Sequence, residues 1–153
     1  LGADAEFEFH FIGPIKESNQ LKDARIIYHG EQRDVSHIRM LLSQCDCLVC
    51  PSHSEGMPTV ILEAMASGLA IIGTNVGAVE RQIDGNGILL EKPDVVQLKR
   101  ALDTVIGWDE KTLSACKERS LEIIKSTFLW EQVVKQKMED FKRCSKSEIE
   151  LSE

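Results

Sequence analysis

Short apolar runs and apolar stripes with helical spacing alternate along the chain as far as Leu90. Runs of four to six residues that are rich in Ile, Val, Phe and Cys are typical of β-strands. Apolar residues that recur every three or four positions are typical of one face of a helix. The strands predicted in this way cover residues 7–12, 25–29, 47–50, 70–74 and 87–90.

Stretches with helical spacing lie between several of these strands, and Asp34 is a plausible N-cap for the first of these helices. Beyond Leu90 the strand pattern stops and only helical stripes remain, to about Cys144. Trp130 and Phe141 lie on the last stripe and are predicted to be packing anchors, with a sugar-stacking platform as the alternative. The predicted helices cover residues 35–42, 60–66, 95–106, 113–124 and 130–141.

Strands that alternate with helices through short turns indicate an α/β fold, an open parallel sheet with helices on both faces. Residues 47–49 and 70–72 are apolar without alternation, as expected of central strands that are buried on both sides. The prediction is one domain over residues 1–144 with a helical C-terminal part. The polar residues 145–153 are predicted to be a disordered tail.

Composition removes several classes of function. The 153 residues carry a net charge of −7, which disfavours binding to nucleic acid or to an anionic membrane surface. No apolar run approaches the roughly 20 residues that a transmembrane helix requires, and no signal peptide opens the sequence. These features predict a cytoplasmic protein. Its five cysteines are expected to be reduced, and Cys45, Cys47 and Cys50 fit a buried strand better than a zinc site.

Residues 51–60 carry the candidate chemistry. A buried strand ends before Pro51, and Pro58 suits the first turn of the helix that follows. Ligands of open parallel sheets bind beyond the carboxyl ends of the strands, where this loop is expected to lie. Pro58 has no amide hydrogen, and the four free amides at the helix start suit a phosphate or diphosphate. These amides belong to Gly56, Met57, Thr59 and Val60.

Two carboxylates flank this predicted anion site. Glu55 directly precedes it, and Glu63 follows Thr59 by four residues and therefore shares its helix face. Carboxylates are poor partners for phosphates, so both are expected to accept hydrogen bonds from hydroxyl groups. Hydroxyls on both sides of a diphosphate describe a nucleotide sugar, with its ribose and its hexose. The alternative is that both residues are merely solvated.

The same stretch resembles a known family. Residues 55–63 read Glu-Gly-Met-Pro-Thr-Val-Ile-Leu-Glu, which looks like the E-x7-E motif of retaining glycosyltransferases of GT-B fold and family 4 type, the glycosyl transferases group 1. Residues 26–30, Ile-Ile-Tyr-His-Gly, are similar to the family's strand that ends in Gly. Residues 41–52 and 70–90 match its next two strands and an Asn-Gly turn.

The resemblance implies the C-terminal, Rossmann-like half of a GT-B fold that binds a UDP- or GDP-linked sugar. It implies a hexosyltransferase of bacterial glycan biosynthesis that retains anomeric configuration and needs neither metal nor cofactor. Glu55 is the catalytic candidate, because the family's first motif Glu binds the donor sugar, and Glu63 would bind the ribose. The donor-binding candidates are Gly30, His53, Gly56, Met57, Pro58, Thr59 and Glu63, of which His53 is suggested by its position alone.

The sequence also departs from the family. The opening strand, its Gly-Arg turn and a downstream Lys, which supply two cations to the diphosphate, are not found, and the acceptor-binding N-terminal domain is expected as a missing partner. The chain is therefore expected to be inactive alone. The full-length protein could attach peripherally to a membrane. A non-catalytic nucleotide-sugar-binding or interaction module is the alternative. A receiver-like signalling domain fits poorly, because Gly13 and Pro51 stand where its carboxylates belong.

Overall fold

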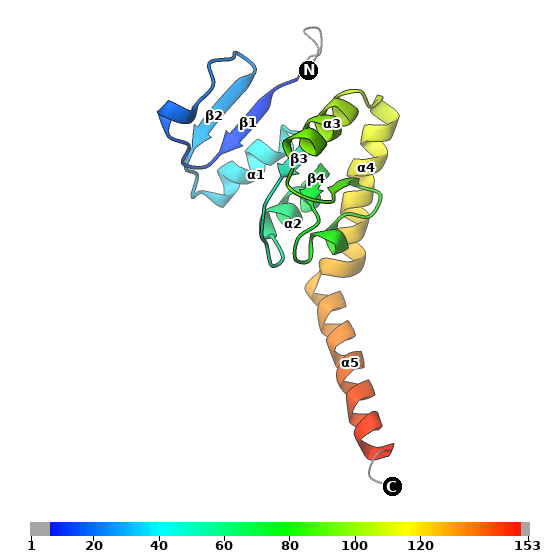
Figure 1. The fold of residues 1–153 in the computed structure, drawn as a ribbon. Coiled ribbons are helices and arrows are strands. Elements are labelled where there is room, and N and C mark those ends of the chain that lie inside the picture. The colour runs from blue at the N-terminus through cyan, green and yellow to red at the C-terminus, as the bar shows by residue number, and fades with distance from the viewer. Residues whose placement is uncertain (1–6, 151–153) are drawn as a thin grey trace.

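A computed structural model of the chain describes residues 7–150, which fold into parallel strands, covering helices and a long C-terminal helix (Figure 1). The strands are β1 (Phe9–Ile12), β2 (Ile26–Gly30), β3 (Cys47–Cys50), β4 (Ala70–Thr74) and β5 (Gly87–Leu90). The α-helices are α1 (Val35–Ser43), α2 (Thr59–Ala66), α3 (Val95–Ile106), α4 (Glu110–Ile123) and α5 (Trp130–Glu150). Shorter helical turns are η1 (Glu17–Asn19), η2 (Val79–Gln82) and η3 (Ile124–Phe128).

These elements confirm the order of strands and helices that the apolar pattern predicts. Aspartates begin three of the helices, since their carboxylates accept the otherwise unpaired amides of the first turn. Asp34 accepts from the Ser36 amide at 2.9 Å at the start of α1, as predicted. Asp94 and Asp109 cap α3 and α4 in the same way.

The strands form two parallel sheets, where the sequence predicts one. β1 pairs with β2, and β3, β4 and β5 pair in that order. Within the described residues no strand bridges β1 and β3, and a sequence pattern cannot report which strand edges pair.

The three-stranded sheet is covered on both faces, as predicted. Along β4, Ile71 packs into one core with α1, α2 and α4, whereas its neighbour Ile72 packs into a second core with α3. Successive side chains of a strand point to opposite faces, so this division follows from the period of the strand. All five residues of β4 are buried, which confirms it as a central strand.

A buried polar cluster ties the turn between β4 and β5 to α4. The Asn86 amide nitrogen donates to the Gln82 carbonyl at 3.2 Å and to the Ser120 hydroxyl at 3.1 Å. Its oxygen accepts from the Asp84 amide at 2.8 Å. Ser120 in turn donates to the Leu69 carbonyl at 2.6 Å. Asn86 and Ser120 are both fully buried, so the bonds to the Gln82 carbonyl, to Ser120 and to the Leu69 carbonyl are shielded from water, whereas the bond from the Asp84 amide is partly buried.

Helix α5 runs away from the rest of the molecule and continues to Glu150 (Figure 1). Six of the residues predicted as a disordered tail are therefore helical, because extending a formed helix is easier than nucleating one; residues 151–153 lie outside the described range. The prediction that Trp130 and Phe141 are packing anchors is wrong, since they are 80% and 75% exposed. The helical stripe is real, but no described element packs on its apolar face.

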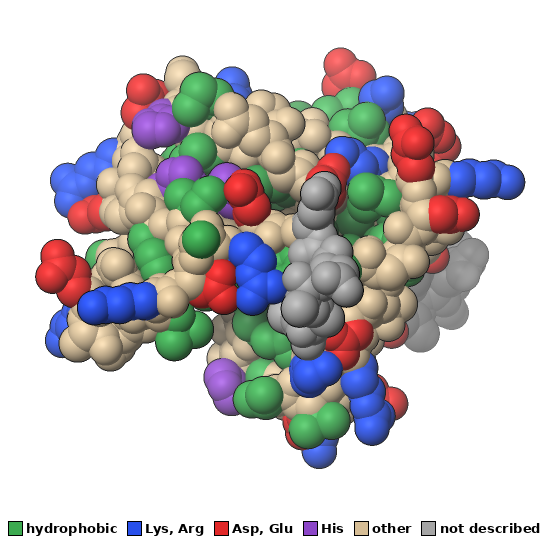
Figure 2. Space-filling model, turned by 90° about the horizontal axis from the view of Figure 1, so that it is seen from above, with side chains coloured by type: hydrophobic (Ala, Val, Ile, Leu, Met, Phe, Trp, Pro, Cys, Tyr) green, Lys and Arg blue, Asp and Glu red, His purple; other side chains and the backbone are tan. Residues whose placement is uncertain are grey.

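Two surface properties agree with the composition. Within residues 7–150, every helix is too short or too polar to cross a bilayer. On the face seen in Figure 2, acidic and basic side chains are interleaved and do not gather into one basic patch. A large polyanion would find no continuous positive surface on that face.

Candidate functional site

The predicted anion-binding loop joins β3 to α2 at the carboxyl ends of the strands. Residues of the connection that follows β4 donate hydrogen bonds to this loop and hold it in place. The Gly56 carbonyl accepts a hydrogen bond from the Ala78 amide at 2.7 Å. The Pro58 carbonyl accepts one from the buried side chain of Gln82 at 3.2 Å. The loop is thus fixed at both ends of its last three residues, which restricts the positions of the Gly56 and Met57 amides.

Gly77 makes this close packing possible. Its φ of +58° lies in the left-handed region that favours glycine. A Cβ atom at this position would lie 2.1 Å from the Glu55 carbonyl oxygen and 2.4 Å from that of Gly56. The backbone of the β4–η2 connection therefore approaches the loop more closely than any side chain would allow.

The helix start offers the predicted backbone donors. Helix α2 begins at Thr59, and no side chain caps its first amides. Pro58 is the N-cap residue, directly before the first turn in which it is predicted to lie. Among the hydrogen bonds of the described residues, none uses the amides of Gly56, Met57, Thr59 or Val60 as donors. Pro58 is buried, whereas Gly56, Met57 and Thr59 are exposed. Uncapped amides with the positive end of a helix dipole favour an anionic ligand.

The two candidate carboxylates remain available for hydroxyl groups. Glu55 is half-buried in the loop, and Glu63 is exposed one helical turn beyond Thr59. Neither side chain has a salt bridge or hydrogen bond to another part of residues 7–150. Their hydrogen-bonding capacity is therefore not consumed within the fold.

Two of the predicted donor-binding residues, Gly30 and His53, take no part in the hydrogen bonds that hold the loop. Gly30 is exposed at the end of β2, in the other sheet, where its carbonyl accepts from the Gly13 amide at 2.8 Å. His53 lies in the loop but is exposed and makes no side-chain hydrogen bond within the described chain. Their roles toward a donor remain predictions.

A histidine pair lies directly before Gly30. His10 Nδ1 is 3.0 Å from His29 Nε2, and the two rings are stacked with their centroids 5.2 Å apart. Burial lowers the pKa of His29 below its ordinary value of 6.5, and the charges of His10 and His37 lower it further. The neutral form of His29 is therefore the one that the folded chain favours.

This pair predicts a loss of stability in mild acid. Unfolded His29 binds a proton near pH 6.5 and folded His29 only at lower pH, so the free energy of unfolding is expected to fall as pH drops below about 6.5. Urea unfolding of the wild type and of His29→Gln at about pH 7.5 and 5.5 measures this, with a smaller loss expected for the variant. His53→Gln is the control that should keep the wild-type pH dependence. Equal losses in wild type and His29→Gln would contradict the prediction.

Four of the cysteines are free thiols. Cys45, Cys47, Cys50 and Cys116 form no disulfide, and no group of three or more potential ligands among residues 7–150 could hold a metal ion. Burial raises the pKa of Cys47 to about 12, which keeps its thiol protonated. A protonated thiol is neither a metal ligand nor a nucleophile at neutral pH.

Gly56, Met57, Thr59 and Val60 of the loop are exposed. Two grooves, of about 700 Å³ and 240 Å³, lie along α5 and between β5 and α3. Sequence reasoning missed Gln82 and the close approach of Gly77, because both act from a segment that follows the motif by some 20 residues. The only signal in the sequence was that Gly77 belongs to the segment similar to the family.

Comparison with known proteins agrees with this geometry. The family model described as "Glycosyl transferases group 1" matches residues 2–107, well over half of the chain. An uncharacterized glycosyltransferase of Methanocaldococcus jannaschii is 34% identical over 146 residues, with 86% of this chain and 39% of that protein covered. N-acetyl-alpha-D-glucosaminyl L-malate synthase of Bacillus anthracis is 30% identical over 84% of this chain and 33% of that protein. The chain thus spans about a third of the length of these relatives.

Solved structures give the same result. The C-terminal domain of a glycosyl transferase group 1 family protein from Francisella tularensis superposes with a TM-score of 0.63 at 33% identity, covering 71% of this chain and 56% of that one. An Anabaena protein in complex with UDP-glucose has the same fold, with a TM-score of 0.67 at 21% identity over 89% of this chain and 41% of that one. The chain therefore belongs to the glycosyl transferases group 1 and has the fold of a GT-B C-terminal domain.

Proposed function

We propose that the chain binds a nucleoside-diphosphate sugar at the start of α2, as the donor-binding part of a hexosyltransferase that retains anomeric configuration. The amides of Gly56, Met57 and Thr59 would hold the diphosphate. Glu55 would accept hydrogen bonds from the sugar hydroxyls and Glu63 from the ribose. By itself the chain would bind the donor without transferring it, since the loop supplies only one side of a cleft.

One observation carries the proposal: unbonded amides at an uncapped helix start lie between two carboxylates that have no partner in the described chain. Such amides favour an anion in a chain whose net charge is −7, because the binding groups are backbone dipoles. The Anabaena structure, which holds UDP-glucose on the same fold, supports the choice of ligand.

Titration with UDP, UDP-glucose and GDP-mannose tests the assignment. A ligand at 100 times its dissociation constant is expected to raise the free energy of unfolding by about 2.7 kcal/mol. Glu63→Ala is expected to weaken the binding of both UDP and UDP-glucose by about tenfold, the loss of one charge-assisted hydrogen bond. Glu55→Ala is expected to weaken UDP-glucose similarly and to leave UDP unchanged, because only the sugar contacts Glu55.

Glu118→Ala, an exposed carboxylate on α4, is the matched control and should bind like the wild type. A folded chain that none of the three ligands stabilises would contradict the proposal. Binding with release of UDP from UDP-glucose would contradict the claim that the isolated chain is inactive. The alternative, a non-catalytic binding module, predicts the same binding pattern but no transfer even when the second wall is supplied.

A further inference from the structure

Arg81 is a basic residue near the candidate site whose side chain is not used by the fold. It lies exposed on η2, and in the described part of the chain its guanidinium makes no ion pair or hydrogen bond. The carboxylate of Asp84 is bonded to Arg119 instead. In the connections that follow β3 and β4, residues 51–58 and 75–86, Arg81 is the only lysine or arginine.

The connection that carries Arg81 is bonded to the loop on both sides of this residue. Before it, the Ala78 amide donates to the Gly56 carbonyl at 2.7 Å. After it, the Gln82 side chain donates to the Pro58 carbonyl at 3.2 Å. The backbone of Arg81 is therefore held at a fixed position relative to the start of α2.

The geometry of η2 places Arg81 on the same side of the turn as Ala78. The Arg81 amide donates to the Ala78 carbonyl at 3.1 Å, the bond between residues three apart that defines a 3-10 turn. Residues with this spacing lie one above the other, about 6 Å apart along the turn. Val79 and Gln82 share the buried side in the same way. Arg81 thus stands above the residue that contacts Gly56, at a distance that a long, flexible side chain can span.

The Gln82 side chain provides a second, independent observation at the helix start. Gln82 is fully buried, and its Nε2 reaches the carbonyl of Pro58, the N-cap residue of α2. Its Oε1 accepts no hydrogen bond from any described residue. A buried acceptor without a donor is unfavourable, which indicates that a bound molecule or its water completes the bonding here.

The proposed ligand requires a cation at this position. The diphosphate is negative, and the two side chains that flank it, Glu55 and Glu63, are negative as well. The start of a helix offers only about half a positive charge. An arginine supplies a full charge, and its planar group of N–H donors matches two phosphate oxygens.

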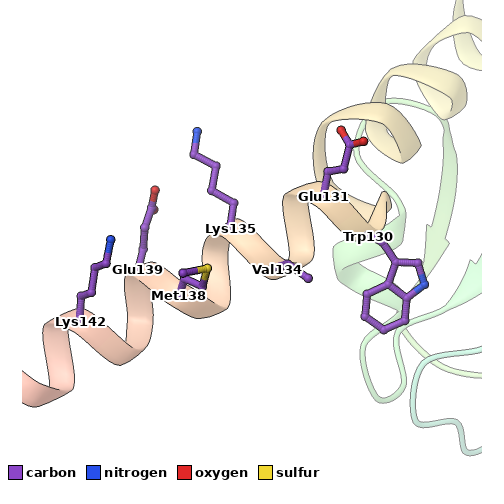
Figure 3. Close-up of a pocket in the computed structure, with 7 residues that line it drawn as sticks. All are labelled: Trp130, Glu131, Val134, Lys135, Met138, Glu139 and Lys142. Carbon is purple, nitrogen blue, oxygen red and sulfur yellow. The ribbon is translucent and has the colours of Figure 1, made fainter.

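Neither of the two grooves uses this cation. The groove along α5 is lined by residues of that helix alone (Figure 3). The groove between β5 and α3 is lined by residues from 88 to 104. The positive charge of Arg81 is therefore left for the loop to which η2 is bonded.

We propose that Arg81 binds the diphosphate of the nucleotide sugar, together with the amides at the start of α2. This inference rests on the proposed function and adds to it a charged side chain that follows the motif by 18 residues. It makes Arg81 the residue that distinguishes a diphosphate from a monophosphate of the same nucleoside.

Isothermal titration of the Arg81→Gln variant with UMP, UDP and UDP-glucose tests the inference. The variant is expected to bind UDP and UDP-glucose at least about tenfold more weakly than the wild type, and to lose less affinity for UMP. Its affinity for UDP should also depend less on salt concentration. Arg81→Lys is expected to recover part of the affinity, because it keeps the charge but not the planar pair of donors.

Two controls separate this role from others. Arg39→Gln on α1 makes the same change at another exposed arginine and should bind like the wild type. Glu63→Ala should weaken UMP and UDP by the same factor, because its proposed contact is with the ribose. If the wild type binds UDP and Arg81→Gln binds it as tightly, or loses as much affinity for UMP, the inference is overturned and the proposed function stands. If none of the three ligands binds the wild type, both are overturned. A lower urea midpoint of the free Arg81→Gln chain would also overturn the inference, since Arg81 would then act through the fold.

Discussion

We expect the Gly77→Ala variant to lose UDP-glucose binding by at least about tenfold while it still folds. The added Cβ would lie 2.1 Å from the Glu55 carbonyl oxygen, a distance at which the loop must move. A shift of this loop displaces Glu55, which is proposed to bind the sugar hydroxyls, and the amide of Gly56, the first of the unbonded donors. A left-handed conformation costs a further 1–2 kcal/mol, roughly, when alanine replaces glycine. Stabilisation by UDP-glucose and urea unfolding of the free chain measure the two effects separately.

Gly85→Ala separates the strain of the backbone from the collision. Gly85 also has a positive φ, +75°, but a Cβ atom there would meet only the Arg119 side chain at 3.8 Å. This control is expected to lose only the cost of the left-handed backbone, about 1–2 kcal/mol, and to keep its affinity for UDP-glucose. If Gly77→Ala bound UDP-glucose as tightly as the wild type, the packing of the loop against Gly77 could not be what positions the site.

Local patterns predicted the elements of this fold because local forces decide them. The apolar run 70–74 is a strand because both of its faces are buried, and Asp34 begins a helix because its carboxylate satisfies a free amide. The apolar stripe on α5 was also recognised correctly. Its burial was not, because periodicity shows that a helix has an apolar face but not whether the described chain covers it.

The candidate site was predictable to the same extent. Glu55, Thr59 and Glu63 follow one another in a single segment, so their spacing could be interpreted directly. The groups that brace this segment could not be found in that way. Gln82 and Gly77 reach the loop only because β4 lies beside β3, and the separation of the strands into two sheets depends likewise on which edges meet. Such facts belong to tertiary structure, and no local period encodes them.

The largest effect on stability is expected for Asn86→Ala. The substitution removes the donor of two hydrogen bonds and the acceptor of a third, and leaves the Gln82 carbonyl, the Ser120 hydroxyl and the Asp84 amide without these bonds. Asn86 and Ser120 are fully buried, and each unsatisfied buried group costs about 1–3 kcal/mol. We therefore expect the free energy of unfolding to fall by about 3 kcal/mol or more, measured as a lower urea midpoint at unchanged m-value.

Ser120→Ala and the double variant show whether the cluster acts as a unit. Ser120→Ala removes the bond to the Leu69 carbonyl and one of the three Asn86 bonds, so we expect a smaller loss on its own. Because the two side chains share a hydrogen bond, the double variant should lose less than the sum of the single losses. Asn75→Ala, an exposed asparagine of the neighbouring connection, is the control and should change stability by less than about 0.5 kcal/mol. Strictly additive losses would show that Asn86 and Ser120 stabilise the fold independently, and a loss at Asn86 no larger than at Asn75 would show that water satisfies the exposed partners.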